Sequence, residues 1–170
     1  MALVEFAIVA PLFFFLLFGL VDFGVNLSNQ ISLRQGVREG ARQGSVANFG
    51  SSTSCGTFTT AGSTNMQKLI CLTTARTDIS AADVSVAIRF DPNSTSYPAA
   101  ATGASPPVGN GIVVCAVTPM VSPSRFLTPF TNGKFIKSKT TMRIEKGSGV
   151  AESIANEADP TGDNWSWCTP

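Results

Sequence analysis

Few residues of this chain have the types and spacing that catalysis or metal binding requires. The chain has 170 residues and contains no histidine. Its absence removes Ser–His–Asp and Cys–His catalysis, histidine metal sites and imidazole pH switches. The four cysteines include no CxxC pair, which argues against a redox or zinc site. No acid/base pair, phosphate-binding loop or nucleophile motif is visible, so the sequence favours a non-enzyme with no metal site and no cofactor.

The cysteines instead favour structural cross-links. An even number of cysteines in a chain with exported character predicts two disulfides, for which three pairings are possible. We favour Cys55–Cys71, which closes a local loop, and this leaves Cys115–Cys168 to fasten the C-terminal tail to a central strand. Closing such loops stabilises a small domain by roughly 3 kcal/mol or more.

Composition and charge exclude further classes of function. Lys and Arg number 12 and Asp and Glu number 11, which gives a net charge of +1. A nearly neutral chain has no electrostatic footprint for nucleic acid. Charged residues make up 14% of the chain, against about 25% in an average soluble domain. The length corresponds to one domain with an added helix, and an ordinary cytosolic enzyme is disfavoured.

The N-terminal segment predicts a membrane helix. Residues 6–21 carry no charge, and the apolar character continues to Leu27 with the single interruption of Asp22. A spanning helix needs about 20 apolar residues. A secretory signal peptide fits poorly, because no basic residue precedes Arg34 and no small-x-small cleavage site follows promptly.

The basic residues that follow raise a conflict about orientation. The positive-inside rule would place Arg34, Arg38 and Arg42 in the cytoplasm together with the bulk of the chain, yet that bulk has exported character. A short basic leader before Met1 would remove the conflict. We therefore expect Met1 to be the first residue of the mature chain.

Two residues inside the apolar segment predict specific roles. A carboxylate such as Glu5 at the edge of an apolar helix costs about 2.5–3.5 kcal/mol or more unless it is paired. The only cation near in sequence is an α-amino group, its own or a neighbour's; alternatively Glu5 lies at the headgroup level. Pro11 removes one helical hydrogen bond, so we expect a kink or local unwinding between Ala7 and Gly19. This would direct aromatic side chains at neighbouring helices, namely Phe13, Phe14, Phe15 and Phe18.

These residues resemble a known family. The chain begins Met1-Ala-Leu-Val-Glu5-Phe6, continues through an apolar run with Pro11, and carries Arg38-Glu39-Gly40-Ala41-Arg42. This pattern is similar to type IV pilins and more closely to TadE-like pilins of the tight-adherence (type IVc) system, over residues 1–45. The resemblance implies that a prepilin peptidase removes a short basic leader after a glycine, and that the new terminus is often N-methylated.

The helical pattern continues beyond the membrane to about residue 47. Gly36, Gly40 and Gly44 recur every four residues, and each costs roughly 1 kcal/mol relative to alanine in a helix interior. We expect this row to permit close approach of the helix backbone to a packing partner, which we expect to be the central strand Ile112–Val117. The parallel row Arg34, Arg38 and Arg42 should then face outward. Fraying towards a loop is the alternative. A helix of 45 residues is about 66 Å long, about twice the hydrocarbon thickness.

The remaining sequence predicts a small β-containing head. Alternation or continuous apolar character predicts strands over Val84–Phe90, Gly111–Thr118 and Phe135–Glu145. A short helix is expected over Asn65–Arg76, a loop over 91–110, and an irregular tail over 147–170. The basic face of the third strand is either a solvated edge or a dock for a neighbour's acidic tail.

The expected fold class is therefore α+β. A long N-terminal helix, with an apolar half and an amphipathic half, packs on a small antiparallel sheet with two disulfides. The expected parts are an apolar filament-core helix (1–27), an amphipathic continuation (28–48) and a disulfide-linked head (49–170).

The resemblance implies a structural pilin. Such a subunit polymerises into a helical filament of identical copies after residing in the inner membrane, and it depends on prepilin peptidase and the pilus assembly machinery. The expected final location is an extracellular pilus on the bacterial surface. A minor pilin or pseudopilin that primes assembly or sits at the tip is the leading alternative, and a membrane-tethered exported enzyme is a third.

Overall fold

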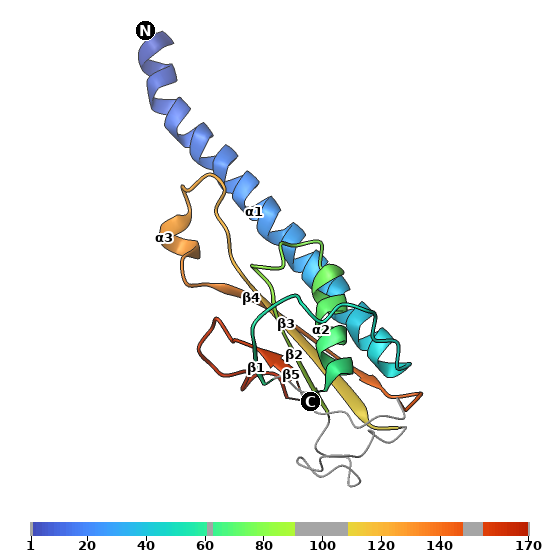
Figure 1. Cartoon of the computed structure of the whole chain (residues 1–170). Coiled ribbons are helices and arrows are strands. Elements are labelled where there is room, and N and C mark those ends of the chain that lie inside the picture. The colour runs from blue at the N-terminus through green and yellow to red at the C-terminus, as the bar shows by residue number, and fades with distance from the viewer. Residues whose placement is uncertain (1, 61–62, 91–108, 148–154, 170) are drawn as a thin grey trace.

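The computed structural model describes residues 2–60, 63–90, 109–147 and 155–169. One long helix, α1 (Ala2–Ser45), runs from the N-terminus to the far end of a small α+β head (Figure 1). Met1 and most of the predicted loop 91–110 lie outside the described residues. The predicted fold class is confirmed.

Helix α1 is continuous over 44 residues, which corresponds to about 66 Å at 1.5 Å per residue. Its N-terminal half projects beyond the head, and its C-terminal half lies along the sheet (Figure 1). The helix ends in a left-handed turn. Ala47 has φ 57°, and the Asn48 N–H donates to the Gln43 carbonyl at 2.9 Å, which satisfies a carbonyl of the last turn.

The predicted unwinding at Pro11 is wrong. Helical geometry is unbroken from Ala2 through Pro11 to Ser45, and Figure 1 shows a gentle curve without a sharp break. A proline removes only one hydrogen bond, to the carbonyl four residues back. The hydrogen bonds on either side keep that loss local, so no rearrangement directs the phenylalanines.

The head is built on a five-stranded antiparallel sheet in the order β1-β5-β2-β3-β4. The three predicted strands are present as its long members: β2 (Ser85–Phe90), β3 (Gly111–Pro119) and β4 (Phe135–Arg143). Two strands of three residues each, β1 (Phe58–Thr60) and β5 (Ala155–Glu157), extend the sheet beyond β2. Strand β5 corrects the expectation that the tail is wholly irregular. Three residues are too few to display a hydrophobic period.

Strand β3, the predicted central strand, lies second from one edge of the sheet and is fully buried over residues 112–118. On one face, Ile112 and Val114 share a core with Leu33 and Val37 of α1. On the other face, Val113, Cys115 and Val117 pack with Trp165 and Cys168 of the C-terminal segment. Both faces of the apolar strand are therefore covered, one by helices and the other by the tail.

Helix α2 (Thr64–Ala75) packs against both α1 and the sheet. Ser63 caps its N-terminus by accepting a hydrogen bond from the Met66 N–H at 3.2 Å, an arrangement that Ser favours. Met66, Leu69 and Ile70 bury their side chains in the helix-side core. The remainder of the head includes α3 (Thr128–Thr131), a single turn between β3 and β4.

The glycine row lies mainly against α2 and the turn that follows it, which corrects the expected partner. A Cβ on Gly40 would overlap the Thr73 hydroxyl, and a Cβ on Gly36 would overlap the Thr77 methyl group. Only Gly44 reaches the central strand, where a Cβ would lie 2.7 Å from Ile112 Cδ1. The central strand shares its core instead with the apolar row Leu33, Val37 and Ala41. The arginine row is exposed, as expected: Arg34, Arg38 and Arg42.

The close approach at Gly40 generates a stability prediction. We expect Gly40→Ala to lower the free energy of unfolding by about 1–3 kcal/mol, the usual cost of overpacking. The matched control is Gly24→Ala, because a Cβ there meets nothing within 4 Å and alanine favours a helix by up to about 1 kcal/mol. Thermal unfolding of the detergent-solubilised chain measures both. Equal melting temperatures for the two variants would contradict close packing.

Candidate assembly surface and the junction with the head

The N-terminal half of α1 presents an uncovered apolar surface. Every leucine, isoleucine, valine and phenylalanine between Leu3 and Phe23 is at least 41% exposed. The predicted assembly residues Phe13, Phe14 and Phe18 lie on this surface and contact one another, with ring centroids 6.1 and 6.2 Å apart. Such a surface requires apolar surroundings. Among the described residues, α1 is the one helix long and apolar enough to cross a membrane.

Glu5 lies on this surface and its side chain is exposed. No basic side chain of the described residues forms an ion pair with it. Met1, the predicted partner through its α-amino group, lies outside the described residues. The pairing of Glu5 with an amine therefore remains a prediction.

Asp22 marks the junction between the apolar surface and the head. Its side chain is fully buried, and its carboxylate accepts hydrogen bonds from the hydroxyls of Ser122 and Ser124. The Ser124 backbone N–H donates a further bond at 3.0 Å. A carboxylate buried without donors would be very costly, so these three bonds stabilise its position.

Asn26 lies one helical turn after Asp22 and binds the same connection between β3 and β4. Its amide nitrogen donates to the Val121 carbonyl at 2.7 Å, and its amide oxygen accepts from the Val121 N–H at 3.2 Å. We call Asp22 and Asn26, with Val121, Ser122 and Ser124, the junction cluster. It fixes the β3–β4 connection against α1.

Sequence reasoning recorded Asp22 only as an interruption of the apolar run and missed the other members of the cluster. A signal was available, because Asp22 and Asn26 are spaced i, i+4 and share a helix face. The Ser122-Pro123-Ser124 segment offers two hydroxyl donors. The sequence does not show that the helix around Asp22 and the segment around Ser122, about 100 residues apart, lie side by side.

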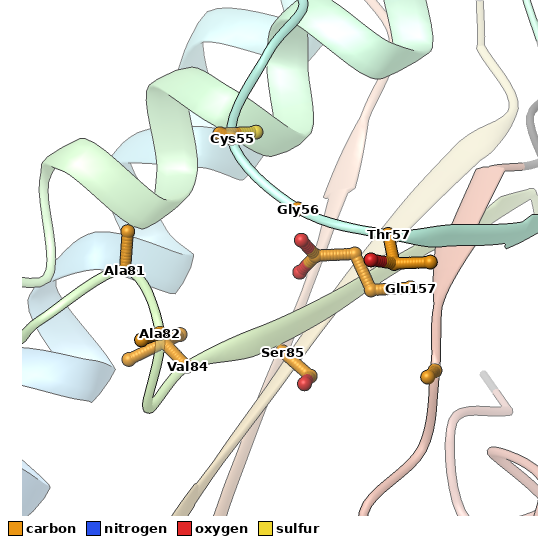
Figure 2. A pocket seen from close by; sticks show the side chains of 9 residues that line it. Cys55, Gly56, Thr57, Ala81, Ala82, Val84, Ser85 and Glu157 are labelled. Carbon is orange, nitrogen blue, oxygen red and sulfur yellow. The ribbon is translucent and has the colours of Figure 1, made fainter.

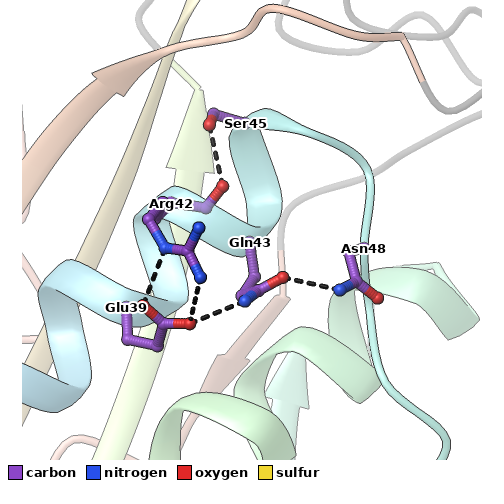
Figure 3. Close-up of polar contacts among 5 residues, drawn as sticks. All are labelled: Glu39, Arg42, Gln43, Ser45 and Asn48. Atoms are coloured by element: carbon purple, nitrogen blue, oxygen red, sulfur yellow. Dashed lines mark hydrogen bonds and ion pairs between the residues drawn. The ribbon is translucent and has the colours of Figure 1, made fainter.

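The Arg38–Arg42 motif divides between the surface and the core. Figure 3 shows Glu39 bound by Arg42 through two bonds of 2.8 Å and by the Gln43 amide at 2.6 Å. Hydrogen bonds from Arg42 and Gln43 lower the pKa of Glu39 to about 2. Gly40 and Ala41 lie between these residues and face inward, both buried. The motif therefore combines a charged outer face with small residues at the packed face.

The disulfides Cys55–Cys71 and Cys115–Cys168 are both present, so the favoured pairing is confirmed. The second joins the tail to the centre of β3. The tail also occupies the basic face of β4. Lys137 pairs with Asp163 at 2.8 Å, and the Lys139 ammonium group donates to the Thr169 carbonyl at 2.8 Å. The basic face of β4 therefore binds the C-terminal tail of the same chain, and not the acidic tail of a neighbour as one of the two alternatives proposed.

A cavity of about 430 Å³ lies beside the first disulfide, between the 55–57 segment and the start of β2. Figure 2 shows the Glu157 carboxylate directed towards Gly56. Glu157 is 4% exposed, and it accepts a hydrogen bond of 2.6 Å from the Val86 N–H. Burial raises the pKa of Glu157 to about 7 against the effect of this bond. Among the residues lining the cavity, it is the single ionisable side chain.

This buried carboxyl predicts a pH-dependent stability. The folded-state pKa of about 7 exceeds the ordinary value of 4.5, so folding favours the protonated form. The resulting stabilisation is complete below about pH 4.5 and is lost as the pH rises to about 7, by roughly 2–4 kcal/mol. Glu157→Gln stays neutral and keeps an acceptor for Val86. Its melting temperature should exceed that of the wild type at pH 8 and equal it near pH 4.

The control for this measurement is Glu145→Gln, because Glu145 is an exposed carboxylate of the same head. It makes the same chemical change outside the cavity, and its melting temperature at each pH is the reference for Glu157→Gln. Parallel curves for Glu157→Gln and the wild type between pH 4 and pH 8 would show that Glu157 ionises normally.

Together these features define a class: a protein whose apolar, membrane-competent helix continues without a break into a disulfide-linked α+β head. Residues 1–42 match the model of the family described as TadE-like protein, which bears out the resemblance seen in the sequence. The matched residues coincide with nearly all of helix α1. No curated protein and no solved structure matches the chain.

Proposed function

We propose that the protein is a structural pilin subunit. It would polymerise through its apolar N-terminal helix into an extracellular pilus of the tight-adherence type. The observation that carries the proposal is the exposed apolar surface between Leu3 and Phe23, on a helix rigidly continuous with a folded head. In a membrane, lipid covers this surface; after extraction, only the same surface of other copies offers an equivalent apolar environment.

The arrangement of helix and head supports a filament with helices inside and heads outside. The sheet lies along the C-terminal half of α1, while the N-terminal half projects beyond the sheet (Figure 1) and touches the head only through the β3–β4 connection. Projecting helices can therefore bundle without steric interference from the sheet. Phe13, Phe14 and Phe18 would then pack between neighbouring helices.

Glu5 would supply specificity to this packing. A carboxylate within an apolar bundle requires a cation or donors, and no basic side chain lies near it in the sequence. The α-amino group of Met1 in an adjacent subunit would neutralise it. This pairing would require Met1 to be exposed as the mature terminus by prepilin peptidase.

A minor pilin that primes assembly or sits at the tip is the second candidate. It is favoured by the family resemblance, since in many tight-adherence systems TadE-like proteins act beside a much smaller major pilin. The chain's abundance in purified surface filaments separates the two roles. A major subunit is the dominant band, and a priming or tip subunit is present at a few copies per filament.

A membrane-tethered exported enzyme is not favoured by the described residues. The cavity beside Glu157 contains one carboxyl and no second ionisable side chain in its lining. General acid–base chemistry commonly employs two such groups whose environments separate their pKa values. The cavity therefore gives this reading little support.

The pairing of Glu5 predicts a selective assembly defect. Glu5→Ala should enter the membrane normally, because it removes a charge from an apolar helix, but it should lose the intersubunit ion pair. We expect filament incorporation to fall at least about tenfold, as a coupling of 1.4 kcal/mol or more would give. Immunoblotting of sheared surface filaments and of membranes measures the two pools.

Glu145→Ala serves as the control, since it removes an exposed head carboxylate and should assemble normally. Wild-type filament amounts from Glu5→Ala would show that Glu5 has no part in joining subunits. Loss of the protein from the membrane pool as well would assign Glu5 to membrane insertion instead.

A further inference from the structure

We infer that the connection between β3 and β4, residues 120–131, is a second membrane-contacting element. It would insert into the lipid leaflet on the head's side of the membrane while the subunit awaits assembly. We call this segment the insertion loop. The inference rests on α1 crossing the membrane and does not depend on which pilus role the protein has.

The contact of the insertion loop with α1 places the loop at membrane depth. At 1.5 Å per residue, residues 2–21 of α1 span about 30 Å, the thickness of the hydrocarbon layer. Asp22 then lies at the boundary on the head's side. The ring of Phe126 contacts the ring of Phe15, with centroids 5.1 Å apart. Phe15 is seven residues before Asp22, or about 10 Å deeper along the helix, so Phe126 lies within the hydrocarbon layer.

The insertion loop presents an exposed apolar surface. Phe130 is 75% exposed and Phe126 is 47% exposed. Met120 and Val121 add further exposed apolar area at 37% and 39%. This surface is continuous with that of α1 through the Phe15–Phe126 contact (compare α3 and α1 in Figure 1). The same lipid that covers Phe15 therefore reaches the loop.

The insertion loop contains hydrogen-bond partners for its own backbone. Irregular backbone at membrane depth is tolerated only when its polar groups are satisfied within the protein. The Ser124 hydroxyl accepts from the Phe126 N–H, and the Ser122 hydroxyl accepts from the Leu127 N–H, at 3.1 and 3.2 Å. Both hydroxyls donate in turn to Asp22. The carboxylate is thus shielded from lipid, and the N–H groups of Phe126 and Leu127 are satisfied within the protein.

Arg125 adds a positive charge to the insertion loop. It is exposed and lies in the sequence between Ser124 of the junction cluster and Phe126. A long basic side chain at this position can extend its guanidinium group to the headgroup level while its stem remains in the apolar layer. The loop is then amphipathic, with an apolar part and a charged part, as binding at the boundary between acyl chains and headgroups requires. Its phenylalanines point to the acyl chains and its arginine reaches anionic headgroups.

The test is depth-dependent fluorescence quenching of the full chain in vesicles of phosphatidylethanolamine and phosphatidylglycerol. Acyl chains brominated near the headgroup end quench a tryptophan only on contact. Phe130→Trp adds a reporter at an exposed site, and the emission of Trp165 and Trp167 in the wild type is subtracted. Phe15→Trp is the membrane-embedded control, and Asn48→Trp, at the far end of α1, is the aqueous control.

We expect the added emission of Phe130→Trp to be quenched at least about half as strongly as that of Phe15→Trp, because the loop reaches the same layer. Asp22→Ala combined with Phe130→Trp should reduce this quenching, whereas Asp163→Ala should not. Quenching no stronger than that of Asn48→Trp, at low protein-to-lipid ratio, would overturn the proposal. So would an unquenched reporter whose emission changes as the protein-to-lipid ratio rises, which would assign the loop to a contact between subunits.

Discussion

The position of one carboxylate organises the connection between the membrane helix and the head. Asp22 interrupts an apolar segment, where an unpaired charge costs about 2.5–3.5 kcal/mol or more. The fold meets this cost by bringing Ser122 and Ser124 from about 100 residues away to donate to it. Because those serines also accept bonds from the loop backbone, Asp22 holds the β3–β4 connection at one position along α1.

The main elements of the fold could be predicted from the sequence because each has a strong local signature. Apolar and polar residues alternate along β2 and β4, and β3 is apolar on both faces. Helix α1 has a continuous helical period. The strands β1 and β5 were missed, since three residues show no period. Pro11 was overinterpreted: one lost hydrogen bond does not unwind a helix whose other turns remain intact.

The candidate site was predicted less completely, because its residues meet only through tertiary structure. The glycine row correctly indicated close packing, but composition could not decide between α2 and the central strand as its partner. Nothing in the sequence around Glu157 predicted that its carboxyl group is buried. Its perturbed pKa arises from burial beside Gly56 and Val86, which follows from the unpredicted pairing of β5 with β1 and β2.

The disulfide Cys115–Cys168 has a mechanical consequence. A pulling force on the C-terminal end of the head would enter the chain near Cys168. The bond passes that force directly to the buried central strand, so the 53 residues of sequence separation are removed from the load path. At about 3.4 Å per extended residue, roughly 180 Å of possible extension is withheld. The head is therefore expected to behave as a short, stiff link under load.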